Sequence, residues 1–215
     1  MQRKLIITDD GSSSIYVEKL GEHYHSHFGA RQESEHIFIN SALKQLNKSE
    51  INILEYGFGT GLNALLSLEY AMINGVKINY TSIEKYPVIS EEYSKLNFGE
   101  KDDLFIKLHE TEWGIDNVIN DNFSLQKINS DFREFNSKSI KFDVVFFDAF
   151  APDVQPHLWS EEIFAFIYNS MNIGGVLTTY TVKGSVRRLL KSVGFDVEKI
   201  PGPPGKREIT RAWKK

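Results

Sequence analysis

Four carboxylates in this sequence each follow an apolar, strand-like run, at the point where a strand is expected to end. They are Glu55, Glu84, Asp131 and Asp148. In an open sheet of parallel strands, ligands bind beyond the carboxyl ends of the strands, so these side chains are expected to meet in one crevice. Ionised carboxylates accept hydrogen bonds, so such a crevice suits a ligand that is rich in amino and hydroxyl groups.

A glycine-rich turn follows the first of these strands. Residues 51–56 lead directly into Gly57, Gly59 and Gly61, and residues 62–73 then have a helical pattern. Glycine permits positive φ and lets a ligand lie against the main chain. The spacing is G-x-G-x-G, whereas sites that hold a pyrophosphate on a helix N-terminus favour G-x-G-x-x-G. We therefore predict a site for S-adenosylmethionine, and the alternative is a turn that binds nothing.

Three of the carboxylates have predicted partners on S-adenosylmethionine, which is called the donor below because it donates a methyl group. Glu55 suits the amino group of its amino-acid part, and Glu84 stands where a carboxylate grips ribose hydroxyls in dinucleotide-binding folds. Asp131 could meet the adenine amino group while Phe132 packs against the ring. Asp131 could equally cap a short helix that begins near Phe132.

The fourth carboxylate, Asp148, ends the run 141–147, whose apolar residues suit a central parallel strand. It could hold an acceptor amine and take its proton, or it could bond loop amides. Phe150, Trp159 and Tyr180 could exclude water from the reaction, or they could be core residues. We assign Phe150 to the catalytic site with Asp148, leave Trp159 open, and find the core at least as suitable for Tyr180.

The composition of the 215-residue chain is typical of one globular enzyme domain, with 41% hydrophobic and 25% charged residues. There is no cysteine, which excludes disulfides and thiolate metal sites, and the start lacks the apolar run of a signal peptide. A cytoplasmic location is therefore expected. The spacing of the six histidines does not decide whether they bind a metal. Because there is no cysteine and methyl transfer from S-adenosylmethionine needs no metal, no metal site is expected.

Charge is distributed unevenly along the chain. Residues 183–215 carry a formal charge of +7 and the remainder −11, although the net charge is only −4. Such a basic segment can face phosphates, or it can be a solvated helix and terminus. The residues that we assign to phosphate contacts are Arg187, Arg188, Lys206 and Arg207.

The order of apolar runs predicts a doubly wound α/β fold with a seven-stranded, mainly parallel sheet and an N-terminal β-hairpin flap. The expected division is a flap and lead-in over residues 1–30 and a Rossmann-like core over 31–215. The hairpin strands are expected at 4–8 and 14–19, and the core strands at 51–56, 77–83, 126–129, 141–148, 175–181, 195–200 and 206–213, the last antiparallel. Helices are expected at 33–46, 62–73, 87–97, 160–171 and 184–192.

Several segments together resemble a known family. They are Glu55-Tyr-Gly-Phe-Gly-Thr-Gly-Leu-Asn63, Asp148-Ala-Phe-Ala-Pro152 with Trp159, Thr179-Tyr-Thr181 with Val186-Arg-Arg188, Gly205-Lys-Arg-Glu208 and, before the core, Tyr24-His-Ser26, Gly29-Ala30 and Glu33-Ser-Glu-His36. They resemble the methyltransferase domain of MnmC, which stands alone as MnmD. The resemblance covers nearly the whole chain.

The resemblance implies a class I methyltransferase that converts the aminomethyl group of 5-aminomethyl-2-thiouridine in tRNA to methylaminomethyl. On this basis Phe58, Asn63 and Lys85 join the donor site, and Tyr24, His25 and Trp159 join the substrate site. A flavin-dependent oxidoreductase domain follows in bifunctional members, and no second glycine motif for FAD is found here, so a separate protein is expected to supply that activity. Two alternatives are an aminopropyltransferase of the spermidine synthase type and a catalytically silent tRNA-binding homologue.

Overall fold

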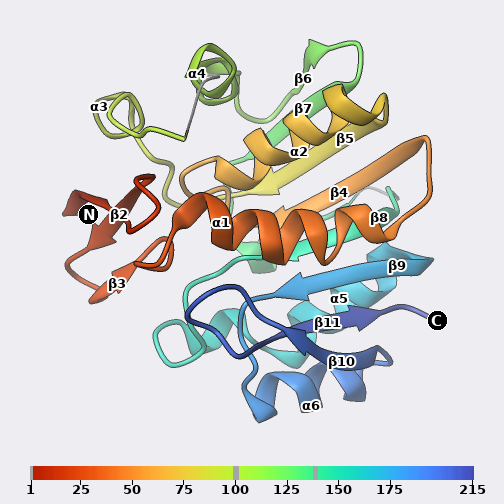
Figure 1. Ribbon diagram of the computed structural model, residues 1–215. Coiled ribbons are helices and arrows are strands. Elements are labelled where there is room, and N and C mark those ends of the chain that lie inside the picture. The colour runs from red at the N-terminus through yellow and green to blue at the C-terminus, as the bar shows by residue number, and fades with distance from the viewer. Residues whose placement is uncertain (1, 99–101, 138–139) are drawn as a thin grey trace.

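The computed structural model describes residues 2–98, 102–137 and 140–215 around an eight-stranded sheet in the order β10-β11-β9-β8-β4-β5-β7-β6 (Figure 1). The strands are β4 (Glu50–Tyr56), β5 (Lys77–Ile83), β6 (Asp116–Asn120), β7 (Phe123–Ile128), β8 (Phe142–Phe147), β9 (Met171–Thr179), β10 (Asp196–Pro201) and β11 (Glu208–Trp213). Strands β7, β5, β4, β8 and β9 pair in parallel, whereas β6 and β11 are antiparallel to their neighbours.

The predicted α/β fold and the antiparallel last strand are therefore confirmed, but the predicted strand number is wrong by one. The additional strand is β6, which pairs only with β7 at the edge of the sheet. Its sequence, Asp-Asn-Val-Ile-Asn, has two adjacent apolar residues and no apolar–polar alternation. In the structure Val118 is exposed and Ile119 is buried. Backbone pairing with β7 forms this strand, and the sequence pattern carries little sign of it.

Alternation along the buried strands creates two apolar layers. In β8, Val144 and Phe146 face one core cluster while Val145 and Phe147 face the other. The first layer is covered by α1 (Ala30–Ser34) with its π-helical extension (Glu35–Asn40), α2 (Leu62–Asn74) and α4 (Asp102–Glu110). The second is covered by α5 (Glu161–Ser170) and α6 (Gly184–Ser192). This layering is that of a doubly wound sheet (Figure 1).

The N-terminal segment forms a separate three-stranded sheet of β1 (Arg3–Ile7), β2 (Ser13–Val17) and β3 (Glu22–His23). The predicted hairpin is present, and β3 extends it by a short third strand. Its turn is held by Asp10, whose carboxylate accepts from the Ser12 amide at 3.0 Å and from the Thr8 hydroxyl at 2.7 Å. The small sheet lies beyond the carboxyl ends of the parallel strands (Figure 1).

Helices 62–73, 160–171 and 184–192 are found within one or two residues of their predicted ends, but the other predictions need correction. The helix expected at 33–46 begins at Ala30 and ends at Asn40, because the backbone of Ala42 leaves helical geometry at φ −126° and ψ −70°. A 3-10 turn at Leu43–Gln45 follows.

The helix expected at 87–97 is only the four-residue α3 (Ser90–Tyr93), and α4 was not predicted at all. After α3 the chain buries Leu96 and Phe98 on either side of an exposed residue, which is an extended pattern. Within the described part of the chain, no helix has the length and apolar character needed to cross a membrane.

Candidate active site

A cavity of about 430 Å³ opens at the carboxyl ends of the parallel strands, between the main sheet and the N-terminal sheet. It brings together most of the residues predicted from sequence. Those on its wall are Tyr24, His25, Gly57, Phe58, Gly59, Asn63, Glu84, Lys85, Asp131, Phe132, Asp148, Phe150, Tyr180 and Lys206. Six predicted residues lie off its wall: Glu55, Gly61, Trp159, Arg187, Arg188 and Arg207.

The glycine turn is shaped by close backbone approaches. Gly57 has φ +97°, and a Cβ atom there would lie 2.8 Å from the carbonyl oxygen of Asp148. Gly59 has φ +51°, and a Cβ there would lie 3.0 Å from the ring of Tyr24. Left-handed φ values are costly for residues with a side chain, so both positions require glycine. The turn is therefore packed between the loop that follows β8, which contains Asp148, and the N-terminal segment, which contains Tyr24.

Glu84 ties the glycine turn to the end of β5. One of its oxygens, Oε2, accepts from the amide of Gly59 at 3.1 Å, and Oε1 accepts from the amide of Tyr86 at 2.7 Å. Burial raises the pKa of this carboxyl, and the two backbone amides oppose that rise. Glu84 thus stands on the cavity wall where contacts with ribose hydroxyls were predicted.

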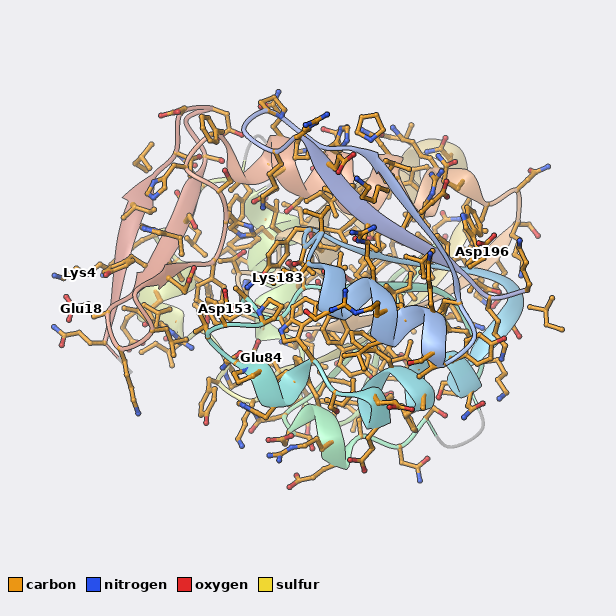
Figure 2. The ribbon with its side chains drawn as sticks, turned by 90° about the horizontal axis from the view of Figure 1, so that it is seen from below. Lys4, Glu18, Glu84, Asp153, Lys183 and Asp196 are labelled. Atoms are coloured by element: carbon orange, nitrogen blue, oxygen red, sulfur yellow. The ribbon has the colours of Figure 1, made fainter. Side chains whose placement is uncertain are left out.

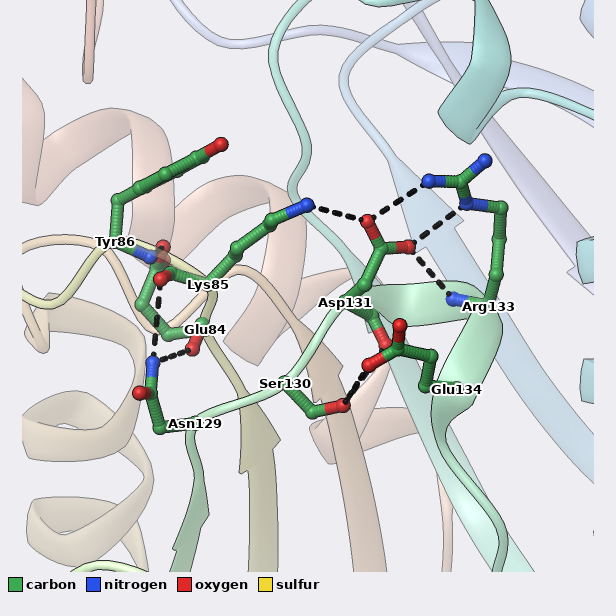
Figure 3. Close-up of polar contacts among 8 residues, drawn as sticks. All are labelled: Glu84, Lys85, Tyr86, Asn129, Ser130, Asp131, Arg133 and Glu134. Atoms are coloured by element: carbon green, nitrogen blue, oxygen red, sulfur yellow. Dashed lines mark hydrogen bonds and ion pairs between the residues drawn. The ribbon is translucent and has the colours of Figure 1, made fainter.

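Asp131 begins the 3-10 turn Phe132–Glu134 and caps it by accepting from the amide of Arg133 at 3.1 Å (Figure 3). Its carboxylate also accepts from Lys85 Nζ at 2.8 Å and from Arg133 Nε at 2.9 Å. These cationic partners, Arg133 above all, hold the pKa of Asp131 well below its usual value. The capping alternative is thus present in the structure, and the adenine contact stays a prediction.

A single amide links two carboxylates beneath and beside the cavity. Asn63 Nδ2 donates to Glu55 Oε1 at 3.0 Å and to Asp148 Oδ2 at 2.9 Å, and Ser82 donates to Glu55 Oε2 at 2.6 Å. With its nitrogen toward both acids, the Asn63 amide gives each of them a hydrogen-bond donor. Glu55 is fully buried and lies off the cavity wall, so Asn63 stands where Glu55 was predicted to meet the donor.

In this orientation none of the described residues donates to the carbonyl oxygen of Asn63, although the side chain is only 3% exposed and belongs to the cavity wall. Buried polar atoms in native proteins almost always have a partner. The ammonium group of S-adenosylmethionine would supply the missing hydrogen-bond donor. The cavity therefore fits such a ligand on an observation that is independent of the glycine spacing.

Replacing Asn63 by leucine should remove the donor that both carboxylates share. We expect a loss of about 2 to 4 kcal/mol in the free energy of unfolding, because two buried acceptors lose a partner. Urea denaturation of the variant measures this loss. Asn74→Leu, at an exposed position of the same helix α2, is the matched control and should change stability by less than about 1 kcal/mol. Equal effects at the two positions would contradict the bridging role.

Burial raises the pKa of both bridged carboxyls. The pKa of Glu55 rises to about 8, and that of Asp148 rises to about 7 by burial and then by the charge of Glu33. The amide of Asn63 acts in the opposite direction on both. Asp148 therefore changes its charge near neutral pH, as a group that takes a proton in catalysis should.

The rate of the predicted methyl transfer should therefore depend on pH through the ionisation of Asp148. Its carboxylate is the proton-accepting form, so kcat/KM should fall about tenfold per pH unit below pH about 7 and level off above it. A pH profile of kcat/KM between 5.5 and 9 measures this limb. A profile that stays level down to pH 5.5 would show that Asp148 keeps its ordinary pKa or takes no proton.

The N-terminal segment is joined to the glycine turn through His25. Its Nε2 atom lies 2.7 Å from Thr60 Oγ1, and burial lowers its pKa to about 4, so the imidazole is neutral. The ring of Tyr24 packs edge-on against Phe150 with centroids 5.2 Å apart. His25 thus serves first as a tether of the segment, while Tyr24 and Phe150 form an aromatic side of the cavity.

The other two aromatic residues have separate roles. Trp159 lies in the core against Phe147, with ring centroids 4.8 Å apart, and its Nε1 donates to the carbonyl of Phe150 at 2.8 Å. Tyr180 is on the cavity wall and donates to the carbonyl of Ala149 at 2.9 Å. Trp159 therefore supports the loop after β8 from beneath. Tyr180 lies on the cavity wall and also packs against the first core cluster, so its position agrees with both alternatives considered for it.

An ion pair between Asp153 and Lys183 joins the same loop to the start of α6 (Figure 2). Both side chains are well exposed, so the pair contributes little to stability. No group of three or more His, Asp or Glu side chains that could hold a metal ion occurs among the described residues.

Sequence reasoning did not place Glu33 in the site. Glu33 lies on α1, is 8% exposed and is part of the cavity wall. Its Oε1 atom pairs with Lys206 Nζ at 2.6 Å, and this ammonium also lies 4.6 Å from the centroid of the Tyr180 ring. Lys206 therefore faces the cavity, in contrast to the other predicted phosphate contacts. The available signal was the family resemblance, because one of its segments, Glu33-Ser-Glu-His36, contains this acid.

Comparisons with known proteins agree with this geometry. A family model described as S-adenosyl-L-methionine-dependent methyltransferase matches residues 114–215. The tRNA 5-methylaminomethyl-2-thiouridine biosynthesis bifunctional protein MnmC of Aromatoleum aromaticum is 29% identical over 97% of the chain, and that of Marinomonas sp. is 32% identical over 83%. The chain spans about a third of the length of these relatives, 35% and 29% respectively.

A solved structure is similar over the whole chain. MNMC2 from Aquifex aeolicus superimposes with a TM-score of 0.85 at 27% identity, covering 100% of this chain and 71% of that one. The chain belongs to the family of the MnmC methyltransferase domain. The N-methyltransferase NodS from Bradyrhizobium japonicum shares the fold alone, with a TM-score of 0.52 at 10% identity over 82% of this chain and 92% of that one.

Members of this family use S-adenosylmethionine, whose sulfonium carries the methyl group that is transferred. Residues predicted to hold it lie on the cavity wall: Gly57, Gly59 and Asn63 for its amino-acid part, Glu84 for its ribose, and Asp131 with Phe132 for its adenine. Asp148 and Phe150, which are predicted to face the acceptor, line the same cavity. Enzymatic methyl transfer is thus established for the family, and the acceptor is considered next.

Proposed function

We propose that this protein methylates the amine of 5-aminomethyl-(2-thio)uridine at the wobble position of tRNA, giving 5-methylaminomethyl-(2-thio)uridine. The observation that carries this proposal is Asp148, a carboxylate on the cavity wall that is held by Asn63 and has a pKa near neutrality. Support also comes from the MnmC relatives, whose name states biosynthesis of this nucleoside. Only methyl transfer is assigned to these residues, and another catalytic centre supplies the aminomethyl group.

The reaction needs an amine with a free lone pair, since an ammonium has none. In the carboxylate form, Asp148 accepts a proton from the acceptor nitrogen, whose lone pair then forms the new N–C bond as the S–C bond of the donor breaks. Tyr24, Phe150 and Tyr180 surround this end with apolar surface, which limits water and holds the acceptor in line with the methyl group.

Mass spectrometry of nucleosides tests this function. tRNA that carries 5-aminomethyl-(2-thio)uridine is incubated with the protein and S-adenosylmethionine, and a gain of one methyl on that nucleoside is expected. tRNA with an unmodified wobble uridine is the control and should gain nothing. A gain of an aminopropyl group, or no change despite donor binding, would overturn the proposal.

We also propose that Arg187, Arg188 and Arg207 contact tRNA phosphates around the cavity. Arg187 and Arg188 lie on α6, which follows the carboxyl end of β9, and Arg207 precedes β11, which starts at the same edge of the sheet. Arg188 and Arg207 are exposed, and Arg187 is partly so. All three therefore lie on the edge that holds the site.

Replacing Arg187 and Arg188 by alanine should weaken tRNA binding and lower the log–log salt slope by about 1 to 2, because each lost phosphate contact removes about one released counterion. Titrations of tRNA at several salt concentrations measure the slope. Lys77→Ala with Lys141→Ala is the matched control, since both lysines lie at the amino ends of parallel strands. A slope equal to that of the parent protein would contradict the assignment.

A further inference from the structure

Helix α1 presents two polar side chains to the acceptor end of the cavity. Glu33 and Ser34 are 8% and 1% exposed, and both belong to the cavity wall, as Asp148 does. The charge of Glu33 acts on Asp148, where it is the second largest cause of the raised pKa after burial. The acceptor end thus has two acidic residues within electrostatic reach of each other.

Glu33 is held in place by groups from two other segments. Its Oε2 atom accepts from the backbone amide of Ser26 at 2.7 Å, and its Oε1 atom accepts from Lys206 Nζ at 2.6 Å. The hydrogen bond from the Ser26 amide fixes the Glu33 carboxylate to the N-terminal segment. Lys206 is attached by a long flexible side chain that is 30% exposed, so it is the partner that can leave.

The hydroxyl of Ser34 gives a second, independent sign of a ligand. Ser34 is buried on the cavity wall, and its hydroxyl has no hydrogen-bond partner within the described ranges of the chain. A hydroxyl can donate and accept, and buried hydroxyls in native proteins are nearly always bonded. A ligand that fills this part of the cavity can supply its partner.

We propose that Glu33 is a second carboxylate for the acceptor, which binds the incoming cationic amine in exchange for Lys206, while the Ser34 hydroxyl bonds a polar atom of the same nucleoside. This inference rests on the proposed function, since it takes the acceptor to be an amine. The exchange makes binding depend on the positive charge of the acceptor. An uncharged wobble uridine cannot replace the ammonium of Lys206, so Glu33 sets specificity before Asp148 takes the proton.

The pH dependence separates this role from a structural one. Glu33 raises the pKa of Asp148 and Lys206 lowers it, so removing either charge moves the acid limb of kcat/KM, to lower pH without Glu33 and to higher pH without Lys206. The other polar and titratable groups that interact with Asp148 are Glu55 on β4, Asn63 on α2, Tyr80 on β5 and Tyr180 after β9. They are unchanged in both variants.

The experiment compares Glu33→Gln, Lys206→Met and the double variant with the parent protein. For tRNA bearing 5-aminomethyluridine, Glu33→Gln should raise KM about tenfold, because a charged hydrogen bond is lost, and should leave donor affinity within about twofold. Lys206→Met should lower KM, because the carboxylate is then free. This gain should vanish in the double variant. Glu35→Gln, at an exposed position just beyond α1, is the matched control and should behave like the parent.

Several results would overturn the inference. One is an unchanged KM in Glu33→Gln while the parent protein methylates the aminomethyl nucleoside, and that result leaves the proposed function intact. Another is weaker tRNA binding with a lower salt slope in Lys206→Met, which would make Lys206 a phosphate contact. If Glu33→Gln does not fold, Lys206→Met tests the inference alone. A KM that does not fall, or an acid limb of kcat/KM that does not move to higher pH, would then overturn it. A parent protein without activity on the aminomethyl nucleoside overturns the function itself.

Discussion

Replacement of Asp148 by alanine is expected to cut turnover by roughly 10² to 10⁴, the usual scale for the loss of a group that accepts or directs a proton. Donor affinity should change little, because Asn63 keeps its bond to Glu55 at 3.0 Å and the glycine turn is untouched. Single-turnover methylation at saturating donor measures the first quantity, and calorimetry with S-adenosylmethionine measures the second.

The control for this variant is Asp153→Ala, in the same loop. Asp153 pairs with Lys183 at the surface and is 79% exposed, so its loss should leave turnover nearly unchanged. If Asp148→Ala instead unfolds while its folded fraction turns over at the parent rate, the carboxylate is a structural group of the loop. The raised pKa of Asp148 makes this outcome unexpected, because a buried, partly protonated acid is a poor stabilising group.

Replacement of Gly59 by aspartate is expected to abolish donor binding, with Kd raised by more than about 100-fold. The new Cβ would meet the ring of Tyr24 at 3.0 Å, and the new carboxylate would stand beside Glu84, whose Oε2 accepts from the Gly59 amide. Calorimetric titration with S-adenosylmethionine measures the loss, and circular dichroism checks that the fold persists.

Gly75→Asp is the matched control for backbone strain. Gly75 has φ +64°, close to the +51° of Gly59, but a Cβ there has no atom within 4 Å. It should therefore lose a similar amount of stability and keep donor affinity. Unaltered affinity in Gly59→Asp would refute the assignment of this turn to the donor site.

The sequence by itself determined the local and periodic features of this protein. The apolar strands β4, β5 and β8, the glycine turn with α2, and the acids that end the strands all follow from short-range patterns, because a parallel sheet places successive strand ends on one edge. The family resemblance added residues such as Tyr24 and Asn63, which are on the cavity wall. The sequence pattern did not predict β6, because backbone pairing with β7 forms that strand. It also predicted too long a helix at α3, because the chain after Tyr93 soon becomes extended and buries Leu96 and Phe98.

Only the tertiary structure decided which side chains share a contact. Glu55 ends a strand as predicted, yet Asn63 from α2 comes between it and the cavity. Lys206 reads as one member of a basic segment, but it turns inward because Glu33 on α1 offers a carboxylate 2.6 Å away. Glu33 and Lys206 are 173 positions apart in the chain, and Asn63 and Glu55, only eight positions apart, belong to different elements. Periodicity describes which face a residue takes, and the packing of whole elements selects its partner.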